Sequence, residues 1–214
     1  MRHLVKAAKP AVLEANEEAW TREFLLDREN ATKRYRYRND EIKEALRAET
    51  GNKCVYCESR LGHNTPGDVE HMQPTIHAPE LHFSWTNLSL ACTECNRRKG
   101  AAHGSDPFLN PYVDFPEDLL DHLGPVVLPR PGNPRAEIFV RLLELYSPTR
   151  FPLIRQKAEK LWEVQQILER RSAMDDGLLK SLIDRQLRDM ASPTAEYSAM
   201  IRGLLITRGI LAAP

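Results

Sequence analysis

The sequence predicts a mainly α-helical protein with a small zinc-braced core and helices at both ends. Apolar residues recur at helical spacing near both ends of the 214-residue chain. Two Cys-x-x-Cys pairs, at residues 54–57 and 92–95, use all four cysteines of the chain. Between these pairs, two short segments have strand character, at 69–72 and 88–90, which leaves little room for a large sheet.

Composition limits the classes of protein that fit. The length suits one domain, or one domain with a helical extension. Lysine plus arginine and aspartate plus glutamate each total 30, so any basic patch must be local. Residues 1–6 lack the apolar stretch of an export signal, and no apolar run is long enough to cross a bilayer. We therefore expect a cytoplasmic protein without a membrane segment, whose cysteines bind metal rather than form disulfides.

The first elements are expected to be helical. Apolar positions predict a helix over residues 10–28, with Pro10 in its first turn. Residues 33–38 then alternate basic and aromatic side chains, and two interpretations fit them equally well. In one, the cations contact phosphates of a nucleic acid and the rings stack on its bases. In the other, the segment is an edge strand with one solvated basic face.

A second helix leads into the cysteine-rich part of the chain. Asn39 or Asp40 is its expected cap, and Gly51 is its expected end. Residues 52–104 should form the metal-binding core. Within it we expect an irregular loop at 73–84, between the two strands, and a helix that starts after the second cysteine pair.

The remainder of the chain begins with many prolines. Their recurrence from residue 105 to 135 predicts ordered loops, and residues 136–146 mix helix and strand signals. Three amphipathic helices are expected at about 149–172, 175–190 and 193–208. The predicted parts are an N-terminal helical segment (1–51), the core (52–104), proline-rich loops (105–148) and a C-terminal helical region (149–214).

The cysteine pairs predict a structural zinc site. Each pair places two thiolates on one tight turn, and two such turns complete a tetrahedral site with Zn–S distances near ~2.3 Å. An all-cysteine site has no open position, so its zinc should not be catalytic. The alternatives are a redox dithiol or four unrelated buried cysteines. The predicted ligands are Cys54, Cys57, Cys92 and Cys95.

The segment between the pairs contains side chains suited to metal-assisted hydrolysis. Glu70 and His71 are neighbours on a strand, so their side chains should point to opposite faces. His71 is a candidate general base, because the free imidazole has a pKa near neutrality. Glu70 and Asn96 offer oxygen ligands, which favour Mg²⁺ or Mn²⁺. Asn87 opens the second strand.

Cations follow this set directly. Arg97, Arg98 and Lys99 would lie beside the metal, which favours an anionic substrate such as a phosphodiester. Taken alone, a histidine is more often a surface residue, an asparagine a helix cap, and a basic triplet a solvated face. Their joint placement between two zinc-binding turns favours a site. His77 or His82 is the best candidate for a supplementary phosphate or metal contact.

The pattern of these residues resembles the HNH endonuclease motif. The resemblance rests on Cys54-x-x-Cys57, Val69-Glu70-His71-x-x-Pro74, Trp85-x-Asn87-Leu88 and Ala91-Cys92-x-x-Cys95-Asn96-x-x-Lys99-Gly100. It covers about a quarter of the chain. It implies a ββα-metal fold, in which a hairpin and a helix surround one catalytic divalent ion and a four-cysteine zinc site braces them.

The resemblance also implies roles for individual residues. His71 would activate water, Asn87 would hydrogen-bond across the hairpin loop and orient His71, and Asn96 would bind the metal with Glu70. The sequence departs from the consensus twice. Asn96 stands where the family name has its last histidine, and Glu70, one methylene longer, replaces the usual aspartate.

Further residues are similar to one branch of the family, the HNH subunit of Septu-type anti-phage systems (PtuB-like), which also accompanies certain retrons. This similarity covers the residues at 33–38, the helix ending at Gly51, Cys57-Glu58, and Asp106-Pro107 through Asn110-Pro111-Tyr112-x-Asp114-x-Pro116-Glu117. The helical C-terminal part beginning near Arg135-Ala136-Glu137-Ile138 is consistent with it. It implies a partner, an ABC-type ATPase subunit (PtuA-like) that binds and restrains the nuclease.

The leading hypothesis is therefore a metal-dependent endonuclease that acts on DNA, or alternatively on structured RNA such as tRNA. A second hypothesis is a non-catalytic zinc module that binds nucleic acid or a partner protein. A third is an unregulated homing or restriction enzyme, which would cut discrete sites without any partner.

Overall fold

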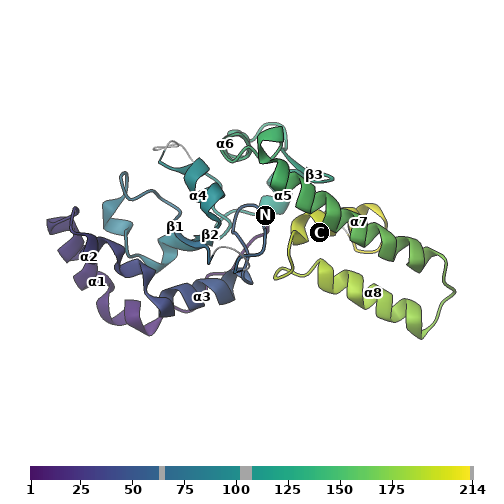
Figure 1. Cartoon of the computed structure of the whole chain (residues 1–214), viewed down its shortest axis with the longest axis horizontal. Helices are drawn as coiled ribbons and strands as arrows, with labels where there is room; N and C mark the ends of the chain where they lie inside the picture. The colour runs from purple at the N-terminus through teal and green to yellow at the C-terminus, as the bar shows by residue number, and fades with distance from the viewer. Residues whose placement is uncertain (63–65, 102–107, 213–214) are drawn as a thin grey trace. The chain divides into compact units, whose positions relative to one another are not determined.

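The computed structural model describes residues 1–62, 66–101 and 108–212 (Figure 1). The chain forms two compact units. The N-terminal unit comprises His3–Tyr56 and Arg60–Asp114. The C-terminal unit comprises Phe115–Pro214, together with Met1–Arg2 and Cys57–Ser59.

The N-terminal unit begins with the two predicted helices. Helix α1 spans Ala11–Leu26 and follows Pro10. Helix α3 spans Asp40–Thr50, and the Asn39 side chain caps it by accepting a hydrogen bond from the backbone N–H of Glu41 at 2.9 Å. It ends at Gly51, whose φ of 64° is left-handed and therefore favours glycine. Both helices confirm the sequence-based expectation.

The basic and aromatic segment between these helices is helical, so its interpretation as an edge strand is wrong. Helix α2 spans Ala31–Arg34, and a 3₁₀ helix continues over Tyr35–Arg38. The Asn30 side chain starts α2 by accepting a hydrogen bond from the backbone N–H of Lys33. Alternating side-chain types are typical of a strand, but the cap at Asn30 favours the start of a helix here.

A hairpin and a helix form the centre of the N-terminal unit. Strand β1 (Asp68–His71) pairs antiparallel with β2 (Leu88–Ala91), with Glu70 opposite Ser89. Helix α4 (Thr93–Lys99) follows and contacts β1. This helix starts before the second cysteine of its pair, earlier than predicted, because Cys92 is its cap. The connection between the strands contains two 3₁₀ turns, Pro79–Leu81 and Trp85–Asn87.

Helix α3 covers the hairpin with apolar side chains. Ile42 and Leu46 of α3 are fully buried, and all four residues of β2 are buried. Helix α3 contacts β2 along this face. Phe83 and Trp85, in the connection between the strands, are buried in the same unit. The buried hairpin thus gives the end of β1 a fixed position.

The C-terminal unit starts with regular structure where loops were expected. Helix α5 (Pro116–Leu119) leads into a hairpin of β3 (Leu120–Leu123) and β4 (Val126–Pro129), and α6 spans Pro134–Leu142. The expectation of loops is wrong here because the prolines occupy tolerated positions. Pro116 and Pro134 lie in first helical turns, where no N–H donor is needed, and Pro129 ends a strand.

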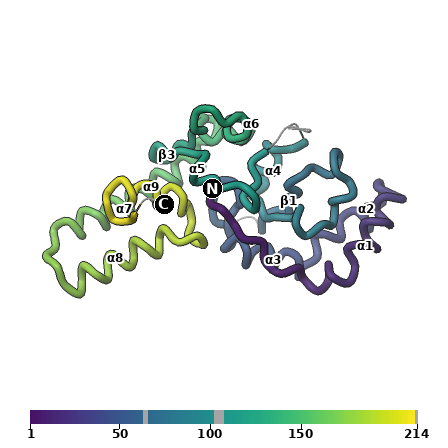
Figure 2. Tube along the Cα trace, turned by 180° about the vertical axis from the view of Figure 1, so that it is seen from behind, coloured from purple at the N-terminus to yellow at the C-terminus, as the bar shows by residue number. Residues whose placement is uncertain are grey.

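The last three helices confirm the prediction. They are α7 (Phe151–Ser172), preceded by a 3₁₀ turn at Pro148–Arg150, α8 (Leu178–Met190) and α9 (Ser198–Thr207). Helices α7 and α8 lie side by side (Figure 2). Among the described residues, no helix combines the length and apolar character required to span a bilayer.

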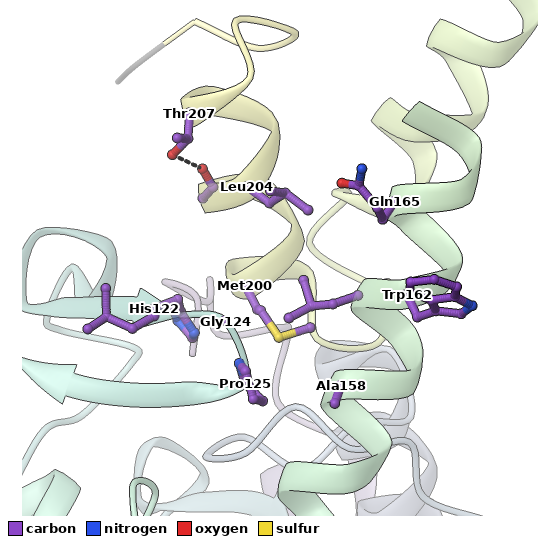
Figure 3. A pocket seen from close by; sticks show the side chains of 12 residues that line it. His122, Gly124, Pro125, Ala158, Trp162, Gln165, Met200, Leu204 and Thr207 are labelled. Atoms are coloured by element: carbon purple, nitrogen blue, oxygen red, sulfur yellow. Dashed lines mark hydrogen bonds between the residues drawn. The ribbon is translucent and has the colours of Figure 1, made fainter. Parts of the chain in front are cut away.

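An apolar pocket of about 590 Å³ lies within the C-terminal unit (Figure 3). Residues of α7 and α9 and the turn between β3 and β4 line it. Met200 of α9 projects into it, and Gly203 on the same helix leaves space, because a Cβ atom built there meets nothing within 4 Å. Ile201 and Leu205 of α9 are fully buried, so the pocket lies beside the packed face of this helix.

Candidate active site

The cysteine sulfurs of both pairs gather in one cluster. The Sγ atoms of Cys54, Cys57, Cys92 and Cys95 all lie within 4.8 Å of one another, and no disulfide joins these four cysteines. Sulfurs around one tetrahedral metal with ~2.3 Å bonds would be roughly 3.8 Å apart. The backbone N–H of Cys95 also points to Cys92 Sγ at 3.4 Å. The cluster therefore has the composition and size of a metal site.

A cavity of about 210 Å³ lies at the end of β1, within the N-terminal unit. Glu70, His71 and Asn96 all line this cavity, and Lys99 lines it with them. The sequence placed Glu70 and His71 on opposite faces of their strand, yet both reach the cavity. The other residues that line it are Arg34, Tyr37, Val69, Pro74, Thr75 and His82.

The imidazole of His71 is held in one orientation. Its Nε2 lies 2.9 Å from the backbone carbonyl oxygen of His82. A carbonyl oxygen can only accept, so Nε2 carries the hydrogen and the lone pair of the neutral ring is on Nδ1. The ring stacks on that of His82 at 4.7 Å, and the Tyr37 ring meets its edge at 4.8 Å. Burial lowers the pKa of His71 to about 3, so the ring is neutral at pH 7.

Asn87 fastens the loop that carries this carbonyl. Its Oδ1 accepts from the backbone N–H of Gln73 at 2.7 Å. Its Nδ2 donates to the carbonyl oxygens of Gln73 and Leu81, each at 3.1 Å. Leu81 precedes His82, whose carbonyl accepts from His71. Asn87 is thus connected to His71 through one short stretch of backbone.

The Glu70 carboxylate is buried but uses only one of its oxygens. Oε1 lies 2.5 Å from Lys99 Nζ and accepts a hydrogen bond from the Tyr56 hydroxyl at 3.0 Å. Among the residues that the structure describes, Oε2 has no hydrogen bond or ion pair. Burial raises the pKa of Glu70, while the Lys99 ammonium opposes this shift. The free oxygen remains available to a cation from the cavity.

Asn96 lies in the first turn of α4, where the sequence placed it. Its Nδ2 donates to Asp68 Oδ2 at 3.5 Å. This bond leaves Asn96 Oδ1 without a partner in the described part of the chain. Together with Glu70 Oε2, it is the second side-chain oxygen available to a cation at this cavity.

Two comparisons with known proteins agree with this geometry. A family model described as HNH endonuclease matches residues 54–102. The Septu protein PtuB of Bacillus thuringiensis is 30% identical over 216 residues, which cover 96% of this chain and 82% of that protein. The chain belongs to the PtuB family. The Septu protein PtuB of Bacillus mycoides (strain KBAB4) is 22% identical over 219 residues, covering 77% of this chain and 73% of that relative.

Family membership gives the cavity its chemical context. The HNH match implies a nuclease, and HNH nucleases depend on metal. The matched segment contains the cysteine cluster, Glu70, His71, Asn87 and Asn96. The similarity to the PtuB relatives places the chain among proteins of the Septu anti-phage system. The motif residues Asp106 and Pro107 lie outside the residues described.

The three predicted cations of this PtuB family member occupy different surroundings. Arg97 and Arg98 both contact Glu94, at 3.0 and 2.6 Å, and this pairing lowers the pKa of Glu94 to about 2. Lys99 is 2% exposed and donates to the His71 carbonyl oxygen at 2.7 Å besides pairing with Glu70. The triplet therefore does not form one exposed basic surface, and its contact with nucleic acid stays a prediction.

Sequence reasoning missed the ring that supports His71. His82 was considered as a supplementary phosphate or metal contact, but both of its nitrogens are engaged. Nδ1 lies 2.8 Å from Thr75 Oγ1, and Nε2 lies 2.7 Å from the Arg34 carbonyl oxygen. Its ring is 2% exposed. His77 instead lies 3.1 Å from the Ala101 carbonyl oxygen. No local sequence pattern indicates that the His82 ring stacks on the His71 ring, because the two residues are eleven positions apart.

Proposed function

We propose that the chain is a metal-dependent endonuclease that hydrolyses phosphodiester bonds of DNA in Septu anti-phage defence. The observation that carries the proposal is the meeting of three groups at one cavity. These are the lone pair on His71 Nδ1, the free oxygen of Glu70 and the free oxygen of Asn96. The HNH match and the similarity to PtuB support the same reaction class.

Zinc is the metal that we assign to the cysteine cluster. Four thiolates within 4.8 Å suit a closed tetrahedral site. Such a site contributes folding free energy rather than chemistry. Zinc would therefore hold the first cysteine pair against the first turn of α4. This turn contains Asn96.

Glu70 and Asn96 are the residues that we expect to hold a catalytic Mg²⁺ or Mn²⁺. Both provide hard oxygen donors, which these ions prefer, and each has one oxygen free of protein contacts among the described residues. A divalent ion bound there would stabilise the negative charge that develops on the leaving oxygen.

The remaining chemistry belongs to the chain itself. His71 Nδ1 would take a proton from the attacking water, since Nε2 is committed to the His82 carbonyl. Asn87 would keep that carbonyl in place through the loop it binds. We also propose, from the likeness to PtuB, that an ABC-type ATPase partner restrains this activity.

The test is a cleavage assay with the chain alone and with its co-purified ATPase partner, with and without ATP. Plasmid DNA and a panel of tRNA are the substrates, with Mg²⁺ or Mn²⁺ present or omitted. His71→Ala should lower the rate by about 10²–10⁴-fold. His77→Ala is the matched control, because His77 is exposed and lies outside the cavity lining.

Each result of this assay has a defined meaning. Metal-dependent cutting that His71→Ala removes and His77→Ala retains supports the proposal. Parental cutting by His71→Ala contradicts the assignment of the base. No cutting by the complex under any condition supports the non-catalytic zinc module, and discrete cutting by the chain alone supports an unregulated restriction enzyme.

A further inference from the structure

We propose that Arg34 and Arg38 form a phosphate-binding site at the edge of the His71 cavity and hold the backbone of the nucleic acid. This inference rests on the proposed function and names the residues that bind its substrate. The two arginines belong to the helical segment Ala31–Arg38, which the sequence left open between nucleic-acid binding and an edge strand.

The segment that carries the two arginines lies at the His71 cavity. Arg34 and Tyr37 both line the cavity with His71. The Arg34 carbonyl oxygen lies 2.7 Å from His82 Nε2, and the Tyr37 ring meets the edges of the His71 and His82 rings at 4.8 and 5.1 Å. The segment is therefore attached to the same ring stack that orients His71. A strand bound at His71 would pass these side chains.

Two of the four cations in this segment are already neutralised by carboxylates. Lys33 pairs with Asp27 at 3.2 Å, and Arg36 pairs with Glu23 at 2.7 Å. Arg34 and Arg38 are exposed and make no ion pair with any residue in the described ranges. Only these two cations of the segment thus leave their charge available to an anion.

Arg34 and Arg38 are both held against one aromatic ring. Arg34 and Arg38 lie four residues apart, and both guanidinium groups lie over the Tyr35 ring, at 5.7 and 4.2 Å from its centroid. Stacking on an aromatic face orients a guanidinium and leaves its N–H edge for hydrogen bonds, part of which Arg38 uses on the Tyr37 hydroxyl. Such an edge matches two oxygens of a phosphate. The net charge of the chain is zero, so a local pair of this kind is needed to attract a polyanion.

The experiment measures how salt weakens nucleic acid binding. Fluorescence anisotropy of labelled duplex and single-stranded oligonucleotides is followed from about 50 to 200 mM salt, without added divalent ions so that the nucleic acid stays intact. The test variant is Arg34→Ala/Arg38→Ala. The control is Lys33→Ala/Arg36→Ala, which removes the same charge from the same segment but from residues already paired. Thermal unfolding checks that both variants fold.

Two phosphate contacts should lower the slope of log affinity against log salt by about 1.8 on duplex and about 1.4 on single strands. Over this salt range, the duplex affinity of the parent chain should fall about 12-fold more than that of the test variant. The control should keep the parental slope. An unchanged slope in the test variant, an equal change in the control, or no binding by the parent chain would overturn the inference.

These outcomes are separate from those of the nuclease assay. A chain that cuts DNA but keeps its slope in the test variant contradicts only the role of the two arginines. A chain whose slope falls as expected but whose complex never cuts contradicts only the nuclease.

Discussion

At the scale of single residues, Lys99 is the clearest example of a side chain whose role depends on a partner far away in sequence. It was predicted to lie beside the metal with Arg97 and Arg98 and to attract an anionic substrate, but it is 2% exposed and pairs with an equally buried Glu70. A buried carboxylate requires a compensating charge, and the end of α4 supplies it. The sequence identifies the cation but not the carboxylate it neutralises.

Removing this lysine should destabilise the chain. Lys99→Met keeps the length of the side chain and leaves the Glu70 carboxylate buried without a cation, which should cost about 3–5 kcal/mol of unfolding free energy. Lys99→Met/Glu70→Gln should recover much of this loss because neither charge remains. Urea unfolding measures both. If Lys99→Met is as stable as the parent chain, the pair is not buried in solution.

Asn87 makes a second prediction at this scale. Asn87→Ala removes the hydrogen bonds to Gln73 and Leu81, leaves their backbone groups unpaired and should cost about 1–3 kcal/mol. The His71 ring should then lose its single tautomer, which ¹⁵N NMR of the imidazole reports. Ser84→Ala is the control, because within the described ranges the Ser84 hydroxyl hydrogen-bonds only with the exposed Thr86 hydroxyl. An unchanged His71 tautomer in Asn87→Ala would show that the loop does not orient the ring.

At the scale of elements, the sequence predicted those helix ends and strands that are determined by residues close by in the chain. The cap at Asn39, the left-handed end at Gly51 and the strands around His71 all follow from nearby sequence. The β3–β4 hairpin did not, because its prolines occupy the few positions that strands and turns tolerate. The stacking of His71 on His82 was also not predictable, since it depends on how the loop between β1 and β2 folds back.

Helix α9 provides a prediction about stability. Gly203 lies inside this helix, and a Cβ atom there meets nothing within 4 Å. Gly203→Ala should therefore raise the free energy of unfolding by about 0.5–1 kcal/mol, as alanine is the better helix former. Gly100→Ala should lower it, because Gly100 has a φ of 48°, a conformation that residues with a Cβ atom rarely adopt. A Gly203→Ala chain that unfolds at a lower temperature than the parent would contradict the open space beside Gly203 in α9.

At the scale of the whole molecule, the four-cysteine cluster is the feature on which we expect the site to depend. The parent chain should contain about one zinc ion, measured by elemental analysis. Cys54→Ser removes one of four ligands and should release the zinc and lower thermal stability. Ser59→Ala, beside Cys57 at 3.2 Å, should keep the zinc because no ligand is lost. Full stability of the metal-free chain would contradict a structural role.

The proposed nuclease activity requires Glu70 and Asn96 to present oxygens to one divalent ion beside His71. Anomalous diffraction from crystals soaked in Mn²⁺ tests it directly. We predict a manganese peak about 2.0–2.3 Å from Glu70 Oε2 and Asn96 Oδ1. A saturating soak that places manganese elsewhere, or leaves Lys99 as the only cation beside Glu70, would contradict the account.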